Sequence, residues 1–235
     1  VLAGSRVDNN LVPIEPIQAK GITEPVAACR VEWEPEDDQT TESRAIPLPP
    51  TFDRSEVVAL VGRDEERSAI VDAWKEVVSG GRRVVLVAGE PGIGKTRLVK
   101  EVCRLAHAHG GTVLWGGCEE ELGIPYQPFV EAIRFYAGVA ELDDLRTDLG
   151  PLGGELVRLV PELGRLVPDL HAPVTADADT ERYRLFEGVV ELLAALSARA
   201  PVLLVLDDLH WAAKPTLLLL RHVLRAPATL RLLVV

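Results

Sequence analysis

Residues 84–96, Val-Val-Leu-Val-Ala-Gly-Glu-Pro-Gly-Ile-Gly-Lys-Thr, decide the fold of this chain. Residues 89–96 fit the pattern G-x-x-x-x-G-K-[ST], a loop whose backbone N–H groups surround phosphate. The apolar residues 84–87 before the loop predict a buried strand, and helical spacing of apolar residues over 98–105 predicts a helix after it. Strand, glycine-rich loop and helix form the context that a phosphate-binding loop requires. A glycine-rich turn before an ordinary helix is the alternative.

The loop predicts a role for each of its polar side chains. Its glycines let consecutive N–H groups turn inward, and the N-terminus of the following helix adds a partial positive charge. Lys95 is predicted to reach the β- and γ-phosphates of a nucleotide, and the Thr96 hydroxyl to ligate Mg²⁺. Arg97 is a weaker candidate, because it fits a solvated helix face equally well. The predicted phosphate-binding residues are Gly89, Gly92, Ile93, Gly94, Lys95, Thr96 and Arg97.

A second apolar run ends in two acids. Residues 201–206, Pro-Val-Leu-Leu-Val-Leu, precede Asp207 and Asp208. A strand that is apolar throughout is buried on both faces, as in a parallel sheet, and the ligands of such sheets lie outside the carboxyl ends of the strands. Asp207 is therefore predicted to hold Mg²⁺, and Asp208 to orient or deprotonate the attacking water. Taken alone, the same pattern also fits an acidic surface turn after a strand.

Strands and helices alternate over the rest of the chain from residue 56. Helices are predicted over 63–78, 97–109, 128–138, 180–199 and 211–225, and further strands over 112–117 and 229–235. Glycine and proline break residues 142–178 into short helices and turns, one of which is predicted to carry Leu156, Leu159, Val160 and Leu163. This alternation predicts an α/β fold with a parallel sheet flanked by helices.

The first 55 residues have a different character. Residues 12–17 and 26–31 predict two short strands around a turn, which is too little to bury a core. Residues 35–55 are acidic and rich in proline, which predicts an extended linker with no packed core. The predicted divisions are therefore residues 1–34, the linker 35–55 and the α/β domain 56–235.

Composition restricts the class of protein. The net charge of −11 argues against a nucleic-acid surface, and no apolar run approaches the length of a membrane span. Cys29, Cys103 and Cys118 have no metal-ligand or paired spacing, and they suit a reducing compartment, so a cytoplasmic location is expected.

The histidines offer less chemistry. His107 and His109 are two apart on a predicted helix and cannot share a face, so neither is given a role. His210 and Trp211 follow the two acids. They form either a switch contact or a packed tryptophan beside a solvent-facing histidine.

Four separated blocks together resemble the regulatory AAA-like ATPases of the signal-transduction class with numerous domains (STAND). The blocks are Leu-Val-Gly-Arg-Asp-Glu-Glu at 60–66, the phosphate loop, Gly-Ile-Pro-Tyr-Gln-Pro-Phe at 123–129 and Leu-Asp-Asp-Leu-His-Trp-Ala at 206–212. In bacteria such domains often occur in LuxR-type transcriptional regulators and in multidomain class III nucleotide cyclases. The resemblance covers about residues 56–235 and implies an ASCE-type P-loop core in which Val61, Gly62 and Arg63 contribute to the adenine pocket.

The same resemblance implies parts that lie beyond Val235, namely a polar sensor residue, the next core strand and a helical lid. Without that strand we expect an apolar sheet edge to be exposed, with weak nucleotide binding and slow hydrolysis. Family members often carry an acid after Trp-Ala, where this chain has Ala213 and Lys214. This departure affects a local helix-capping or switch contact.

Residues 20–31 resemble the closing strands of a class III adenylate/guanylate cyclase domain, so residues 1–34 are interpreted as its C-terminal remnant. The resemblance suggests a parent protein that joins a cyclase to an ATPase. The metal-binding and catalytic segments of a cyclase do not occur in this sequence, so cyclase activity is not expected of it.

The expected function is an ATP-binding and ATP-hydrolysing regulatory switch that uses ATP and Mg²⁺. A non-hydrolysing interaction module that keeps nucleotide as a structural cofactor is the main alternative. A small-molecule phosphotransferase is a further one, for which no acceptor pocket can be named. The expected partners are output domains of the same chain, with self-association as another option, and neither nucleic acid nor membrane.

Overall fold

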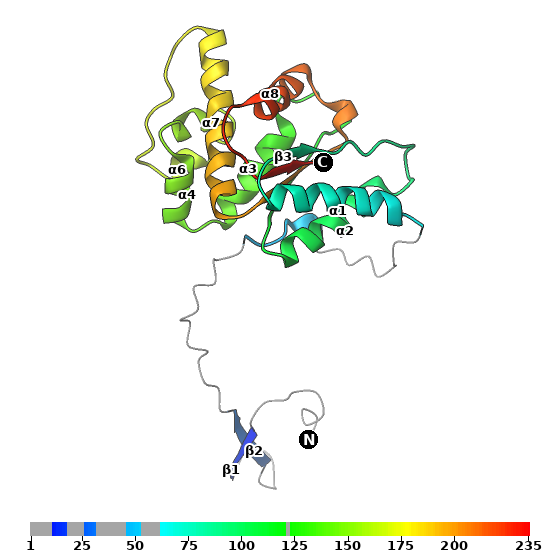
Figure 1. The fold of residues 1–235 in the computed structure, drawn as a ribbon. Coiled ribbons are helices and arrows are strands. Elements are labelled where there is room, and N and C mark those ends of the chain that lie inside the picture. The colour runs from blue at the N-terminus through cyan, green and yellow to red at the C-terminus, as the bar shows by residue number, and fades with distance from the viewer. Residues whose placement is uncertain (1–10, 18–25, 32–45, 53–61, 121–122) are drawn as a thin grey trace. The chain divides into compact units, whose positions relative to one another are not determined.

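The computed structural model describes residues 11–17, 26–31, 46–52, 62–120 and 123–235, and the chain divides into two units, residues 1–44 and 45–235 (Figure 1). In the first unit, β1 (Leu11–Ile17) and β2 (Val26–Val31) pair antiparallel, with Leu11 opposite Val31 and Ile17 opposite Val26. These are the two predicted short strands. The predicted turn between them lies outside the described residues.

The larger unit is built on a parallel sheet, which in the described part of the chain has four strands in the order β3-β6-β5-β4. The strands are β3 (Arg82–Val84), β4 (Thr112–Gly117), β5 (Val202–Asp207) and β6 (Leu232–Val234). Strand β6 therefore lies between the strand that leads into the phosphate loop and the strand that ends in the two acids. This is the α/β architecture that the sequence predicted.

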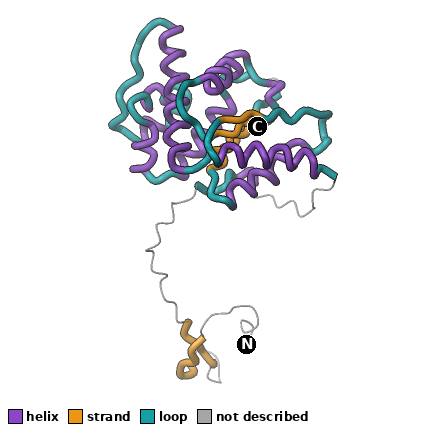
Figure 2. Tube along the Cα trace, viewed as in Figure 1, coloured by secondary structure: helices purple, strands orange, loops and turns teal. Residues whose placement is uncertain are grey.

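Helices cover both faces of this sheet (Figures 1 and 2). One face carries α1 (Asp64–Val78) and α2 (Lys95–Ala108). The other carries α3 (Gln127–Val139), α7 (Ala178–Arg199) and α8 (Lys214–Arg225), and α4 (Leu142–Leu149) and α5 (Gly153–Leu156) pack on α7. The remaining elements are α6 (Leu163–Leu166) and two short 3-10 turns, η1 (Pro50–Phe52) and η2 (Leu209–Trp211).

Alternate side chains of the central strand enter two separate apolar clusters. Leu203 and Val205 of β5 belong to the cluster beneath α1 and α2, whereas Val202, Leu204 and Leu206 belong to the one beneath α3, α7 and α8. Each of these five side chains is at most 5% exposed. The uninterrupted apolar run therefore reflects burial on both faces of a parallel sheet, as predicted.

The strand before the phosphate loop is shorter and more exposed than predicted. Strand β3 ends at Val84, and the N–H of Val85 continues its pairing with the carbonyl of Val234 at 2.9 Å. Among the described strands only β6 flanks β3, so Val84 is 43% and Leu86 77% exposed. The prediction that residues 84–87 form a buried strand is therefore wrong in extent and burial. The exposed apolar edge is the one expected from the family resemblance.

Two helix predictions also need correction. The residues Leu156 and Leu163, predicted on one helix, instead end α5 and begin α6, with Pro161 between them. Their helix-like spacing reflects burial, because both are fully buried in the same apolar cluster. Helix α8 begins at Lys214 and not at Trp211, because η2 occupies residues 209–211 and Pro215 favours the first turn of a helix.

Part of the predicted linker packs on the larger unit. Phe52 is 7% exposed, and its ring meets that of Trp115 edge to face with 5.5 Å between centroids. Nε2 of His107 lies 2.9 Å from the carbonyl oxygen of Ile46. The apolar residues Ile46, Leu48 and Phe52 supply a buried face that the proline-rich composition of the whole linker concealed. Residues 35–45 and 53–55 of that prediction lie outside the described residues.

Arg82 of β3 binds the C-terminal end of α8. Replacing Arg82 is therefore expected to lower the stability of the protein. Its guanidinium donates to the carbonyls of Val223, Ala226 and Ala228 at 2.7, 3.0 and 2.8 Å. Carbonyls at a helix end have no partner within the helix, and a charged donor that supplies one contributes more than a neutral donor. We expect Arg82→Met to lower the free energy of unfolding in urea by about 2–3 kcal/mol.

Arg83 provides the matched control, because it is exposed and pairs with Glu76 at the surface. We expect Arg83→Met to lower the free energy of unfolding by less than about 1 kcal/mol. Equal losses in the two variants would contradict a capping role for Arg82.

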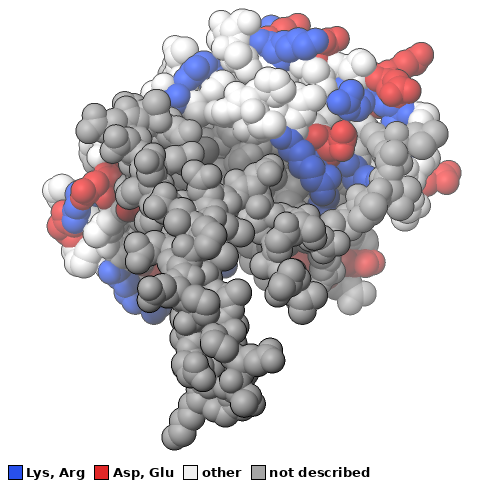
Figure 3. Space-filling model, turned by 90° about the horizontal axis from the view of Figure 1, so that it is seen from below, with Lys and Arg blue, Asp and Glu red and all other residues white. Residues whose placement is uncertain are grey.

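Charges of both signs mix on the surface. On the described part of the face in Figure 3, Lys and Arg side chains lie next to Asp and Glu side chains. Arg146 and Asp169 form one of the exposed ion pairs of the protein, at 3.1 Å. Within the described residues, no helix combines the length and the apolar character that crossing a membrane requires.

Candidate functional site

The phosphate loop turns sharply between β3 and α2. Gly92 and Gly94 have φ angles of 77° and 96°, in the left-handed region that glycine enters without steric cost. Gly94 caps α2, and its carbonyl accepts the N–H of Leu98 at 3.0 Å. The first N–H groups of a helix have no partner within the helix, so those of α2 are directed toward the space that the loop encloses.

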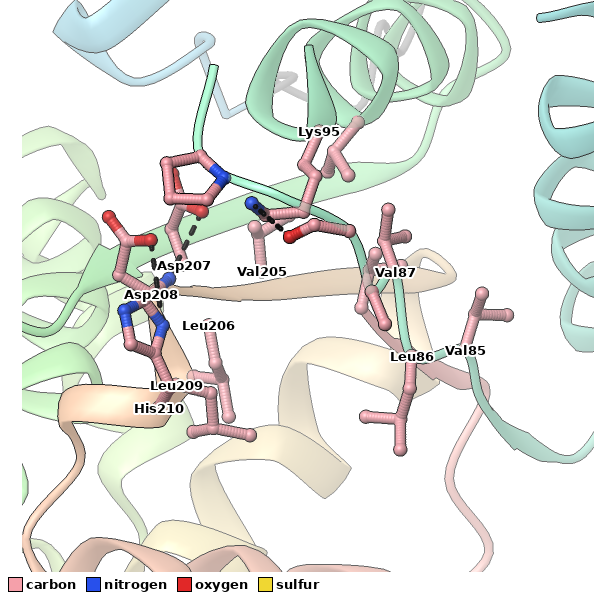
Figure 4. A pocket seen from close by; sticks show the side chains of 15 residues that line it. Val85, Leu86, Val87, Lys95, Val205, Leu206, Asp207, Asp208, Leu209 and His210 are labelled. Carbon is pink, nitrogen blue, oxygen red and sulfur yellow. Dashed lines mark hydrogen bonds and ion pairs between the residues drawn. The ribbon is translucent and has the colours of Figure 1, made fainter. Parts of the chain in front are cut away.

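Lys95, the first residue of α2, folds back over the loop (Figure 4). Its ammonium nitrogen donates to the carbonyls of Gly89 and Glu90 at 3.1 and 3.2 Å. These contacts hold the charge at the entrance of the loop, where a phosphate group would compete with the two carbonyls for the same N–H groups.

Thr96 and Asp207 are 111 residues apart in the sequence and meet at this site, because α2 begins and β5 ends at the same edge of the sheet. The Thr96 hydroxyl donates to Oδ2 of Asp207 at 3.2 Å. A hydroxyl and a carboxylate are hard oxygen donors, and Mg²⁺ is usually bound by one or two such protein groups together with nucleotide phosphates and water. The donor set therefore fits the metal that the sequence assigns to these two residues. Among the described residues, no group of three or more His, Cys, Asp or Glu side chains is arranged to hold a metal.

The environment of Asp207 disfavours its charge. Burial raises the pKa of this carboxyl and the neighbouring Asp208 carboxylate adds to the effect, while the Thr96 hydroxyl, the Asp208 N–H and the charge of Lys100 lower it in part. The net direction is a raised pKa. The folded protein therefore binds this proton more tightly than the unfolded chain does, and the ionised carboxylate opposes folding above the raised pKa.

The raised pKa of Asp207 predicts that replacing this carboxylate stabilises the folded protein. We expect Asp207→Asn, without nucleotide, to be more stable than the wild-type protein near neutral pH, because the neutral amide removes an unfavourable charge. The difference should shrink as the pH falls through the raised pKa, where wild-type Asp207 becomes protonated. Thermal unfolding of the variant and the wild-type protein, at neutral pH and at about pH 4, measures the stability difference at each pH. A variant that is less stable than the wild-type protein at neutral pH would contradict this expectation.

Asp208 turns the chain out of β5. Its backbone is left-handed (φ 53°, ψ 40°), which among the described residues other than glycine is shared only with Tyr126. This conformation is uncommon outside glycine, although Asp and Asn adopt it more readily than other residues. The side chain is 52% exposed, and its carboxylate lies 3.9 Å from Nδ1 of His210 (Figure 4). An accessible carboxylate thus stands beside Asp207 at the carboxyl end of the strand.

Two cavities adjoin Lys95, and Asp208 and His210 line both of them. The first, of about 500 Å³, is mainly apolar and runs along residues 85–89 and the end of β5, with Asp207 and Lys95 at one end (Figure 4). The second, of about 660 Å³, is lined mainly by polar and charged residues and is called the polar cavity below. Predicted site residues that line this second cavity are Gly92, Gly94, Lys95, Thr96, Arg97 and Asp208.

Other predicted residues lie elsewhere. Gly89 lines the first cavity, whereas Ile93 is 49% exposed and lines neither. Gly62 and Arg63 directly precede α1, where Arg63 pairs with Glu66 at 2.6 Å. Neither Gly62 nor Arg63 lines either cavity. Val61 lies outside the described residues. The adenine-pocket role of this segment stays a prediction.

Five residues that were not assigned to the site also line the second cavity: Pro91, Lys100, Glu120, His210 and Trp211. Lys100 follows Thr96 by four positions on α2 and so shares its helix face, a signal that the sequence contained. Glu120 follows β4, whose end lies beside that of β5. Trp211 is 40% exposed, and its ring centroid lies 4.9 Å from that of His210, which is 63% exposed. The two alternatives for this pair stay predictions.

Side chains of α3 fix the strand end beside Asp207. Oε2 of Glu131 accepts the N–H of Gly117 at 2.8 Å, and the Gln127 amide donates to the other oxygen of Glu131 at 3.1 Å. The N–H of Cys118 then donates to the backbone carbonyl of Asp207 at 3.0 Å. Within the block at residues 123–129, Gln127 thus acts through Glu131 on the strand end beside the candidate metal site.

Comparison with known proteins agrees with this geometry. A family model described as an AAA ATPase domain matches residues 59–235. An uncharacterized protein of Rhizobium meliloti (strain 1021), R02095, is 25% identical over 170 residues, which make up 65% of this chain and 16% of that protein. This chain thus spans a small part of the length of that relative. No solved structure matches this chain. Since the family match extends over more than half of the sequence and includes the loop, the sheet and both aspartates, the chain belongs to the AAA ATPase domain family.

Proposed function

We propose that residues 59–235 bind ATP together with Mg²⁺ and hydrolyse it, and that the nucleotide state acts as a switch in a larger protein. The observation that carries this proposal is the 3.2 Å contact between Thr96 and Asp207 at the mouth of the phosphate loop, with Lys95 and Asp208 beside it. Membership of the AAA ATPase domain family supports nucleotide binding and ATPase activity.

Each group has a distinct role in this proposal. The N–H groups of the loop and of the first turn of α2 bind phosphate oxygens, and the Lys95 ammonium leaves its two carbonyl partners for the β- and γ-phosphates. Thr96 and Asp207 hold Mg²⁺, which when bound offsets the negative charge of the phosphates. Asp208 accepts a hydrogen bond from the attacking water and orients it toward the terminal phosphorus. His210 lies close enough to Asp208 to restrict the position of that carboxylate.

The wider setting is also part of the proposal. ATP and ADP can switch a protein only if its two conformations bind them with different affinities. We infer that the module belongs to a multidomain signalling protein of the cytoplasm, such as a LuxR-type regulator or a class III cyclase, and acts on output domains in the same chain. The four sequence blocks at 60–66, 89–96, 123–129 and 206–212 support this inference.

The direct test uses the 235-residue chain. Titration with a fluorescent ATP analogue should give saturable binding that ATP displaces and that EDTA weakens. A phosphate-release assay should detect slow turnover. Saturable binding with no phosphate release would favour the non-hydrolysing module, and the absence of any nucleotide binding would overturn the proposal.

A further inference from the structure

The polar cavity contains a cation that the phosphate-loop pattern does not specify. Lys100 lies one helical turn after Thr96, on the same face of α2, and lines the cavity with Lys95 and Asp208. Lysine is a flexible point charge with three donors, a side chain that proteins commonly use to bind phosphate. Its position relative to Thr96 places it on the side of the loop where Asp208 and His210 line the same cavity.

An aromatic ring from outside the helix contacts this lysine. The Lys100 ammonium nitrogen lies over the ring of Phe52, 6.0 Å from its centroid. A cation at this distance is attracted to the face of an aromatic ring. Phe52 is 7% exposed and packs edge to face on Trp115, so the ring itself is fixed. The ring therefore restricts a side chain that would otherwise sample many rotamers.

The segment that carries the ring is docked independently of Lys100. Pro49 is buried, and its carbonyl accepts the N–H of Phe52 at 3.0 Å in the η1 turn. At the start of the segment, His107 of α2 contacts the carbonyl of Ile46 at 2.9 Å. The placement of Lys100 thus depends on residues 46–52 as well as on α2.

We propose that Lys100 is a phosphate-binding residue of the nucleotide site and that Phe52 is its positioning residue. This inference rests on the proposed function, because it assigns Lys100 to the terminal phosphate of the bound ATP. ADP lacks that group and gains less from the ammonium. By linkage, docking of residues 46–52 and ATP affinity favour each other.

Arg104 supplies a matched control for Lys100. Its guanidinium also lies over the Phe52 ring, at 5.7 Å from the centroid, but it does not line the polar cavity. Lys100→Met and Arg104→Met each remove one positive charge from α2. We expect Lys100→Met to raise the Kd for ATP about fivefold, as for the loss of one solvent-screened contact between unit charges. The Kd for ADP should rise less, and Arg104→Met should leave both constants unchanged.

Two variants test whether the aromatic face of Phe52 positions Lys100. Phe52→Leu keeps an apolar side chain but removes the aromatic face, whereas Phe52→Tyr keeps the face. We expect Phe52→Leu to shift the ratio of the Kd for ATP to the Kd for ADP toward the ratio in Lys100→Met. Phe52→Tyr should keep the wild-type ratio. In the double variant Lys100→Met/Phe52→Leu the two effects should not add, because they act through one contact.

The outcomes separate this inference from the proposed function. A wild-type protein that binds no nucleotide contradicts the proposed function itself. If the wild-type protein binds ATP and Lys100→Met binds it equally well or more tightly, the inference about Lys100 is overturned while the proposed function stands. Loss of ATP affinity in Arg104→Met equal to that in Lys100→Met would show a general charge effect and would also overturn it. If Phe52→Leu does not fold, Lys100→Met and Arg104→Met still decide the role of Lys100.

Discussion

Asp208→Asn will bind ATP like the wild-type protein but release phosphate about a hundredfold more slowly, the scale expected when a group that positions or activates water is lost. The amide has the same shape as the carboxylate but lacks its charge and its basicity. Asn adopts a left-handed backbone as readily as Asp, so the φ of 53° at this position is not a source of strain in the variant. Single-turnover phosphate release measures the effect on hydrolysis, and equilibrium titration with ATP measures the effect on binding.

Asp72→Asn is the matched control for this variant. Asp72 lies on α1, exposed and paired with Lys75, away from both cavities, so its replacement should change neither binding nor hydrolysis. Turnover by Asp208→Asn at the wild-type rate would remove Asp208 from the chemistry. The hydrolytic role would then need another group.

Lys95→Ala will raise the Kd for ATP by about 10- to 100-fold, which corresponds to the loss of one charged hydrogen bond of about 1.5–3 kcal/mol. The wild-type ammonium is held at the loop by two carbonyls, at 3.1 and 3.2 Å, and a γ-phosphate replaces these neutral partners with a charged one. Equilibrium titration with ATP measures the effect.

Lys75→Ala serves as the control for Lys95→Ala, because Lys75 is exposed on α1, pairs with Asp72 and lines neither cavity. We expect its Kd for ATP to equal that of the wild-type protein. Equal affinities in Lys95→Ala and the wild-type protein would remove the basis for placing the phosphates at this loop.

Several features of the site could be predicted because one local pattern specifies them. The loop pattern specifies the positions of the glycines, of Lys95 and of Thr96. The apolar strand specifies that Asp207 lies at the edge of the sheet. Their meeting at 3.2 Å follows from parallel strands that end at the same edge. The motif ends at Thr96 and so does not point to Lys100 as a residue that lines the cavity, although helical spacing places it on the same face of α2.

Features that depend on distant partners could not be predicted in the same way. The exposure of Val84 and Leu86 depends on which strands flank β3, and no property of residues 84–87 specifies that. Leu156 and Leu163 had helical spacing because both point into one core, although Pro161 separates the two short helices. Phe52 was assigned to a linker because three nearby prolines and many acids outweighed one aromatic residue in the average composition.

The most direct test of the account is a crystal structure of the chain with Mg²⁺ and a non-hydrolysable ATP analogue. We predict that the β- and γ-phosphates lie between the loop N–H groups and the Lys95 ammonium, with the metal bound by Thr96 and, directly or through water, by Asp207. A nucleotide bound away from this loop, or a metal that contacts neither Thr96 nor Asp207, would contradict the account.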